Sequence, residues 1–551
     1  MRNEIYYAWL ENQDISNSYK KIMEEMSDDE CSVAFSLKPI QFGTAGYRAK
    51  IGPGNHYLNE KTYKQLAIGY AKFLKNKFPN KNLKVLVTHD NRYNGMFYTD
   101  VVGSTLYENG ITPIIVENNE LLPTPIASYL ISKMGLDGGI NITASHNPKE
   151  YNGFKCYNET GSQILPYEAN QIVENLPSWK DALNNKINLD YKYETVNKKF
   201  IDEYFDDVIR SLPNTKLIDK NLQVVYSSMH GTASYYMSKF LNKLGYVCVD
   251  VPSQNYPDHN FENALNCNPE DPISLDRAIT LADTLNINIV LASDPDADRL
   301  AIAIKKDNDW IFINGNQAGI IETYYKLTQL KKTNKTPVII STYISNNLID
   351  RIGKKWDAKI IRTPTGFKWI GDEINKLSKN DLYINGFEEA IGALPSTINR
   401  DKDSFQTAAL VLEIAYNYLT KSMDYIDILE KEIFPTFGHW YGETTSIKIL
   451  GHNWKEIADS VFKKLQKNNL TIIGKRKIVK KFYNEKAGSI DYLFENDSWV
   501  KFRISGTEPK FKIYTNLYPT NDKLIFDLEY TNQLMKESTE IVEKMKKYLG
   551  L

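Results

Sequence analysis

Cysteine is scarce in this chain, and long apolar runs are missing. Only 4 of the 551 residues are cysteine, at positions 31, 156, 248 and 267. They form no Cys-x-x-Cys motif and no disulfide framework, which suits a reducing cytoplasm. No apolar run approaches the roughly 18 residues of a membrane span. We therefore expect a cytoplasmic protein that is not embedded in a membrane.

A surplus of charge of one sign is missing as well. The chain has 67 Lys and Arg against 68 Asp and Glu, so its net charge is −1. This balance argues against a nucleic-acid binder with a broad basic face. Residues 1–35 lack a basic start followed by an apolar core, so we expect a helical extension and not a signal peptide. The polar stretches 175–200 and 306–312 are expected to be loops.

The most informative segment that is present is the loop around Ser145. The apolar run 138–144 predicts a buried strand, and Asn147-Pro148 and Asn152-Gly153 predict tight turns after it. A serine at the end of a strand, on a loop held by turns, is exposed to solvent in a fixed position. Read alone, this is an ordinary polar loop; three further loops of matching character change that interpretation.

The second loop, 293–299, reads Ser-Asp-Pro-Asp-Ala-Asp-Arg between two apolar runs. Carboxylates at spacing i, i+2, i+4 lie on one side of an extended segment and can converge on a hard cation. An EF-hand does not fit, because its sixth and twelfth positions would be Arg299 and Lys305. Magnesium fits better than zinc, since the loop has no cysteine or histidine. The alternative is a solvated acidic turn.

The third and fourth loops also follow predicted strands. Residues 385–392 contain the adjacent pair Glu388 and Glu389, which could accept hydrogen bonds from sugar hydroxyls but is a weak signal alone. Residues 503–510 read Arg-Ile-Ser-Gly-Thr-Glu-Pro-Lys. An arginine fork, two hydroxyls and a glycine turn with free backbone N–H groups are the groups that bind a phosphate dianion.

The chain also repeats itself. Three segments share the order strand, helix, strand, helix, strand, and each distinctive loop follows the third strand of its copy. This alternation predicts parallel sheets with right-handed crossovers. Such sheets place ligands beyond the carboxyl ends of their strands. The predicted strands begin near residues 83, 112 and 139, near 222, 246 and 287, and near 337, 359 and 382.

With all four loops in this order, the chain resembles the α-D-phosphohexomutases. The motifs that carry the resemblance run from residues 42–48 through 143–148, 294–299 and 387–389 to 503–509. Residues 365–369 and 387–392 look most like the branch that contains phosphoglucomutase 2 and phosphopentomutase activity. The resemblance implies three similar α/β domains with mixed or parallel sheets and a smaller α+β C-terminal domain, arranged around a central cleft. The expected boundaries are 1–205, 206–315, 316–432 and 433–551.

The resemblance also implies roles for individual residues. Ser145 would carry a phosphoryl group, and one Mg²⁺ would be held by Ser145, Asp294, Asp296 and Asp298. The base would be Lys155, and His146 lies close to it in sequence. To act as a base near neutral pH, Lys155 would need a pKa lowered by burial or neighbouring cations. The alternative is that Lys155 only balances phosphate charge. Further cations or substrate contacts are expected from Arg48, Arg299, Thr365, Gly366, Lys368, Glu388, Glu389, Arg503, Ser505, Gly506 and Thr507.

The implied reaction moves a phosphoryl group between carbons 1 and 6 of glucose or mannose phosphate through a sugar bisphosphate, which also primes the enzyme. Ala390 replaces a serine that many hexomutases use to grip the sugar ring. The loss of one neutral hydrogen bond, roughly 0.5–1.5 kcal/mol, is enough to admit a pentose phosphate. A dedicated phosphopentomutase, a non-catalytic sugar-phosphate binder and a metal-dependent phosphatase are the alternatives. We expect small-molecule sugar phosphates as the only partners of a monomer or homodimer.

Overall fold

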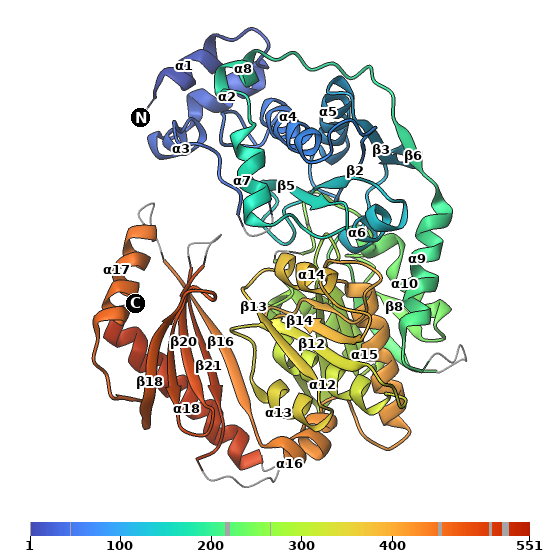
Figure 1. Cartoon of the computed structure of the whole chain (residues 1–551), viewed down its shortest axis with the longest axis vertical. Coiled ribbons are helices and arrows are strands. Elements are labelled where there is room, and N and C mark those ends of the chain that lie inside the picture. The colour runs from blue at the N-terminus through green and yellow to red at the C-terminus, as the bar shows by residue number, and fades with distance from the viewer. Residues whose placement is uncertain are drawn as a thin grey trace. The chain divides into compact units, whose positions relative to one another are not determined.

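The computed structural model describes residues 2–43, 46–214, 221–264, 266–449, 454–505, 510–520 and 528–550 (Figure 1). The chain forms two compact units, which are described separately below. Unit 1 comprises Met1–Phe312 and Ser396–Leu410, and unit 2 comprises Ile313–Pro395 and Val411–Leu551. Among the described residues, no helix has both the length and the apolar character needed to cross a membrane.

Unit 1 begins with three short helices, as expected for residues 1–35. Each starts at a polar side chain that caps the free backbone N–H groups of its first turn, namely Asn3, Ser16 and Ser27. Their apolar faces form a small core with Tyr57 and Leu183 from later in the unit. The helices are α1 (Glu4–Glu11), α2 (Asn17–Glu25) and α3 (Asp28–Ala34).

The first large sheet of unit 1 has the strand order β1-β5-β4-β2-β3-β6. Its central strands are buried along almost their whole length, which is typical of parallel strands with both faces covered. The strands are β1 (Tyr47–Lys50), β2 (Lys84–His89), β3 (Thr112–Val116), β4 (Gly138–Ile142), β5 (Tyr151–Asn158) and β6 (Glu194–Val196). The associated helices are α4 (Glu60–Lys77), α5 (Gly95–Glu108), α6 (Thr124–Lys133), α7 (Pro166–Glu174), α8 (Trp179–Asn184) and α9 (Lys198–Ser211).

The second sheet of unit 1 has the order β11-β10-β9-β7-β8. The strands are β7 (Gln223–Ser227), β8 (Val247–Asp250), β9 (Ile289–Ser293), β10 (Leu300–Lys306) and β11 (Asp309–Ile313), the last of which ends at the first residue of unit 2. Helices α10 (Met237–Lys243) and α11 (Asp276–Leu285) pack against it.

Unit 2 contains the third sheet, in the order β13-β12-β14-β15. The strands are β12 (Thr336–Thr342), β13 (Lys359–Thr363), β14 (Asp381–Phe387) and β15 (Ala393–Leu394). The helices are α12 (Gly315–Thr328), α13 (Leu348–Lys355), α14 (Phe367–Asn375) and α16 (Phe434–Phe437), while α15 (Ser404–Leu419) starts in unit 1 and continues into unit 2.

The three sheets share one topology, which confirms the predicted repeat. In each, the first strand of the copy pairs in parallel with the second on one side and with the third on the other. An antiparallel strand then follows beside the third. Every predicted strand of the repeats begins within two residues of its observed start.

The polar stretches 175–200 and 306–312 are not simple loops, so that prediction was wrong. The first contains α8, β6 and the start of α9, and the second contains most of β11. Asp307 and Asn308 both have positive φ, at 50° and 71°, and form the tight turn between β10 and β11. The sequence did not predict this hairpin, because the polar turn residues stand next to a short, partly exposed strand, and together they have the composition of a loop.

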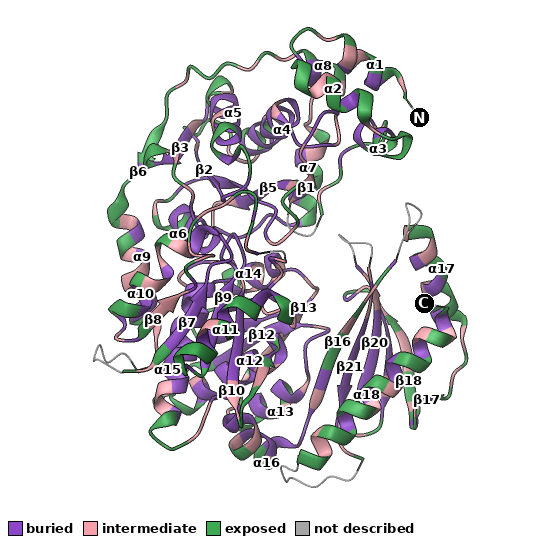
Figure 2. Cartoon of the chain, turned by 180° about the vertical axis from the view of Figure 1, so that it is seen from behind, coloured by how far each residue is buried: buried purple, intermediate pink, exposed green. Residues whose placement is uncertain are grey.

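Unit 2 ends in an antiparallel sheet with the order β16-β21-β20-β19-β18-β17. Figure 2 shows β20 and β21 largely buried, and α17 and α18 exposed on one side. The core of this sheet includes Phe502 and Ile513 from the strands and Ile541 from α18. The elements are β16 (Tyr441–Lys448), α17 (Trp454–Lys467), β17 (Ile472–Ile473), β18 (Arg476–Asn484), β19 (Ser489–Phe494), β20 (Trp499–Ile504), β21 (Lys510–Leu517) and α18 (Leu528–Leu549).

We expect this antiparallel sheet to depend on the core that it shares with α17 and α18. Phe502 is 0% exposed, whereas Tyr483 on β18 is 48% exposed. Phe502→Ala should cost about 3–5 kcal/mol through lost burial and a cavity, and Tyr483→Ala should cost at most about 0.5 kcal/mol. Hydrogen exchange of the β20 and β21 amides at rising urea concentration measures the unfolding free energy of each variant. Equal effects of the two substitutions would contradict this packing.

Candidate active site

Ser145 lies three residues after the end of β4, in unit 1, and its position is set by backbone geometry. The residue has a φ of +52°, in the left-handed region that non-glycine residues rarely adopt. Its backbone N–H donates to Thr143 Oγ1 at 2.9 Å. Its hydroxyl donates to Asp294 Oδ2 at 2.8 Å. The sequence therefore placed the serine on the correct kind of loop, and folding brings it against the second loop.

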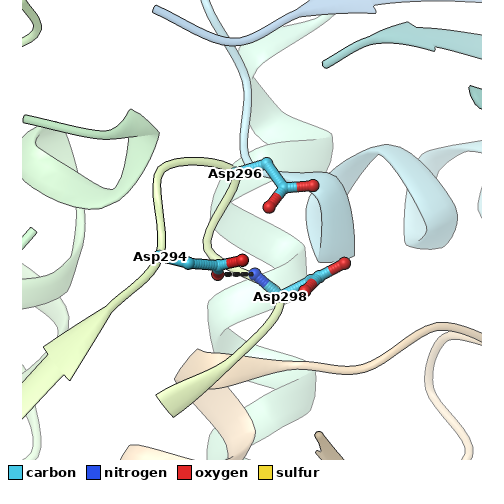
Figure 3. Close-up of side chains that lie close together, drawn as sticks. All are labelled: Asp294, Asp296 and Asp298. Atoms are coloured by element: carbon cyan, nitrogen blue, oxygen red, sulfur yellow. Dashed lines mark hydrogen bonds between the residues drawn. The ribbon is translucent and has the colours of Figure 1, made fainter. Parts of the chain in front are cut away.

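The three aspartates of the second loop follow β9 and converge (Figure 3). Asp294, Asp296 and Asp298 each offer a carboxylate oxygen, and these oxygens lie within 4.8 Å of one another. The turn closes on itself, because the backbone N–H of Asp298 donates to Asp294 Oδ1 at 3.1 Å and that of Arg299 donates to the same atom at 3.0 Å. Ala297 has a φ of +59°, which lets the turn reverse between the carboxylates.

Two neighbouring segments, each at the start of a helical turn, hold this turn from outside. Thr124 donates its backbone N–H to Asp296 O and its hydroxyl to Asp296 Oδ2, both at 2.9 Å. Thr232 donates its backbone N–H to Pro295 O at 2.8 Å. A Cβ on Gly231 would stand 2.5 Å from Pro295 Cα, so only glycine permits this approach. Sequence reasoning did not single out Thr124 or Gly231.

The aspartate residues fit a hard divalent cation. Oδ1 of Asp296 and Oδ1 of Asp298 are buried and have no hydrogen bond among the residues that the structure describes. Burial, together with the charges of Asp296 and Asp298, raises the pKa of Asp294 well above its usual value. Buried carboxylate oxygens without donors are the groups that Mg²⁺ coordinates. Ser145 Oγ adjoins the same cluster through Asp294.

Lys155 lies on β5 and points into the carboxylates. Its Nζ is 3.0 Å from Asp298 Oδ2, 3.1 Å from Asp401 Oδ2 and 3.9 Å from Asp296 Oδ2. Burial by itself would lower the pKa of Lys155, but these carboxylates outweigh burial and hold the pKa well above its usual value. The lowered pKa expected from the sequence is therefore wrong for this arrangement, in which Lys155 is a cation.

Asp401 and Lys402 belong to the same cluster, and the sequence analysis missed them. Asp401 accepts hydrogen bonds from Tyr157 at 2.9 Å and from Gln163 at 2.8 Å. Lys402 Nζ lies 3.0 Å from Asp298 Oδ2. The available signal was the run of alternating charge at 400–403, directly before an apolar helix. Such runs usually belong to solvated surfaces, and here Asp401 is fully buried.

The other predicted residues of unit 1 are His146, Arg48 and Arg299, and of these His146 contacts the Ser145 hydroxyl. His146 Nδ1 lies 3.2 Å from Ser145 Oγ, and burial holds its pKa well below the usual value, so the ring is neutral. Arg48 donates to Asn147 Oδ1 at 3.4 Å, and burial lowers its pKa. Arg299 forms an ion pair with Glu270 at 2.5 Å.

The predicted sugar loop follows β14 in unit 2. Glu388 Oε1 accepts the backbone N–H of Gly366 at 2.7 Å, which brings the 365–368 turn to this loop. Glu389 accepts from Thr342 at 3.2 Å. Burial and the Glu388 charge raise the pKa of Glu389 to about 6, against the lowering effect of Lys512 and Arg503. Thr365 is half-buried, and burial lowers the pKa of Lys368.

The predicted phosphate loop joins β20 to β21 in unit 2. Arg503 on β20 lies opposite Lys512 on β21 in the antiparallel register. The backbone N–H of Ser505 donates to Lys510 O at 2.9 Å. Gly506 and Thr507 lie outside the described residues. The charges of Arg503 and Lys512 both act on Glu389, so the two predicted loops of unit 2 share one electrostatic environment.

Comparison with known proteins agrees with this geometry. Models of the phosphoglucomutase/phosphomannomutase α/β/α domains I, II and III match residues 39–182, 202–307 and 314–431. A phosphomannomutase of Mycoplasmoides pirum is 42% identical over 100% of both chains. A phosphoglucomutase of Staphylococcus saprophyticus is 30% identical, with 96% of this chain and 99% of that protein covered.

The fold is likewise shared with solved structures. The crystal structure of a putative phosphomannomutase from Thermus thermophilus superposes with a TM-score of 0.68 at 22% identity, covering 92% of this chain and 99% of that one. The family models and the relatives aligned along the full length confirm the resemblance seen in the sequence. The chain is a member of the phosphoglucomutase/phosphomannomutase family, the α-D-phosphohexomutases.

Proposed function

We propose that this protein is a phosphosugar mutase that interconverts the 1-phosphate and 6-phosphate of glucose, mannose or both. The observation that carries the proposal is the contact between the Ser145 hydroxyl and Asp294, at 2.8 Å, beside the buried aspartate cluster. A hydroxyl is a weak nucleophile, so we infer that Ser145 starts the cycle as a phosphoserine. The names of the relatives support hexose phosphates as substrates.

The proposed cycle has two transfers. The Ser145 phosphoryl group passes to the free hydroxyl of the sugar monophosphate: the bond from phosphorus to Ser145 Oγ breaks, a bond from phosphorus to the sugar oxygen forms, and the net result moves the sugar hydroxyl proton to Ser145 Oγ. The sugar bisphosphate then turns around, and its other phosphate returns to Ser145. A small amount of sugar bisphosphate would prime an unphosphorylated enzyme in the same way.

The residues of the cluster manage charge during these transfers. A phosphoserine and a sugar phosphate each carry about −1.5 to −2 charges at neutral pH. When bound at Asp294, Asp296 and Asp298, Mg²⁺ supplies a charge that stabilises the transferring phosphoryl group. Lys155 enters as a cation and first balances charge; it can accept the sugar hydroxyl proton only after losing its own. We propose that Arg48 and Arg299 bind phosphate oxygens.

The loops of unit 2 are proposed to bind the remainder of the substrate. Glu388 and Glu389 would accept hydrogen bonds from sugar hydroxyls, with Lys368 beside them. Arg503, Ser505, Gly506 and Thr507 would hold the phosphate that is not reacting. Because either end of the sugar must be accepted there, this loop must recognise phosphate and ignore the ring.

The first prediction concerns Ser145. Freshly purified parent protein should show a phosphoryl group by intact mass, located on Ser145 by peptide mapping. Ser145→Ala should lack the modification and lose mutase turnover, whereas Ser132→Ala, at an exposed position on α6, should retain both. Full turnover by Ser145→Ala would show that the phosphoryl carrier lies elsewhere.

The second prediction concerns the metal. Chelation should abolish turnover, and added Mg²⁺ should restore it. Asp296→Asn should lower kcat more than about a hundredfold, since a lost carboxylate weakens stabilisation of the transferring charge. Asp309→Asn, on the exposed part of β11, is the matched control and should behave like the parent. Near-parental activity of Asp296→Asn in chelator would exclude the proposed site.

The third prediction concerns the sugar. With a bisphosphate primer present, kcat/KM should be highest for glucose 1-phosphate or mannose 1-phosphate, with measurable turnover of ribose 1-phosphate. Ala390→Ser should shift the ratio towards hexoses by about two- to tenfold, the value of one neutral hydrogen bond. A ribose preference above about a hundredfold in the parent would identify a phosphopentomutase. Release of inorganic phosphate without isomer formation would instead indicate a phosphatase.

A further inference from the structure

Arg92 is a buried arginine that the proposed reaction does not use. It follows β2 in unit 1 and is 3% exposed. Its Nη1 donates to the carbonyl oxygens of Pro148 and Tyr151, both at 2.8 Å. Its Nη2 donates to those of Ser145 at 2.6 Å and Asn147 at 2.5 Å. The Ser145 loop therefore wraps around one guanidinium group.

All four Nη donors of this group form hydrogen bonds with the loop. A guanidinium has five N–H donors, two on each Nη and one on Nε. The four Nη donors reach four carbonyl oxygens of the loop. The remaining donor, on Nε, forms no hydrogen bond among the described residues, but it lies in a buried ion pair 3.2 Å from Asp90 Oδ2. Arg92 thus has no Nη donor left for a phosphate, and its Nε is buried beside Asp90, in contrast to Arg48, whose one side-chain hydrogen bond among the described residues is 3.4 Å long.

Asp90 connects the arginine to the same loop from the other side. The backbone N–H of Arg92 donates to Asp90 Oδ1 at 3.0 Å, and the backbone N–H of Asp90 donates to Ile142 O at 3.1 Å. The Thr143 hydroxyl, next along the chain, accepts the backbone N–H of Ser145 at 2.9 Å. Charge-assisted hydrogen bonds from Arg92 therefore bind the loop at Ser145 and after it, and a backbone hydrogen bond from Asp90 holds Ile142, where the loop begins.

We propose that Arg92 is a positioning residue that holds the Ser145 loop in the conformation from which Oγ points at Asp294, and that it binds no phosphate itself. The left-handed backbone of Ser145 is unfavourable for a non-glycine residue and persists only where the surroundings over-determine it. Four bonds from one rigid, planar group supply that constraint. Lysine, a point charge with three donors, cannot reproduce it.

The catalytic consequence rests on the proposed mutase activity, whereas the constraint on the loop can be measured without it. Hydrogen exchange of peptides spanning residues 143–152 should be faster in Arg92→Lys than in the parent, with other regions unchanged. The control is Arg476→Lys. Arg476 is also buried and donates to Glu537, Ser498 and Tyr518 O, but it lies in the C-terminal sheet of unit 2.

Kinetics provide the second readout. In Arg92→Lys, kcat should fall about a hundredfold or more, because a misplaced nucleophile loses its attack geometry. KM for the sugar phosphate should stay within about threefold, since no substrate contact is lost. Added guanidinium ion should restore part of kcat to Arg92→Ala and none to Arg476→Ala.

Three outcomes would overturn the proposal. Unchanged exchange at residues 143–152 in Arg92→Lys would show that the loop does not need the guanidinium. A rise in KM with kcat retained would make Arg92 a phosphate-binding residue. Faster exchange throughout unit 1 would make it a general core residue. If the parent itself fails to isomerise any sugar phosphate, the proposed function is wrong, and the exchange experiment still decides the role of Arg92.

Discussion

The rest of the candidate site depends on one constraint, the burial of several carboxylates in one cluster, one of which accepts the hydrogen bond of the Ser145 hydroxyl. Asp294, Asp296, Asp298 and Asp401 are all fully or almost fully buried. Like charges so close together in the interior are costly unless cations and hydrogen bonds compensate for them. Lys155 and its neighbour Lys402 supply two of the cations, at 3.0 Å from Asp298. The remaining carboxylate oxygens without donors fit the binding of a metal ion.

This compensation is assembled from several parts of unit 1. Lys155 comes from the first sheet, the three aspartates come from the second, and Asp401 comes from the segment 396–410. The aspartates lie on a loop at the carboxyl end of a strand, and Asp401 lies on one before a helix. The shared topology of the three sheets explains how one scaffold supplies several chemistries, because the strands set the position of each loop while the loop sequences set its function.

Much of the fold could be predicted from the sequence, because its signals are local. Buried strands such as β4 and β9 read as continuous apolar runs, and their starts were located within two residues. The hairpin of β10 and β11 was missed, since a half-buried edge strand next to an Asp-Asn turn has the composition of a loop. The domain boundaries and the roles of individual residues stay predictions.

The candidate site, like the fold, has features that the sequence predicts and features that only the tertiary structure sets. The sequence by itself determined the residue types, their order and the loops that carry them, including Ser145 and the three aspartates, because motif spacing is a local property. Only the tertiary structure decided which charges meet. It placed Asp401 against Lys155, reversing the expected direction of the lysine pKa, and it wrapped the serine loop around Arg92. Both are contacts between residues far apart in sequence, and pKa values and loop conformations depend on such contacts.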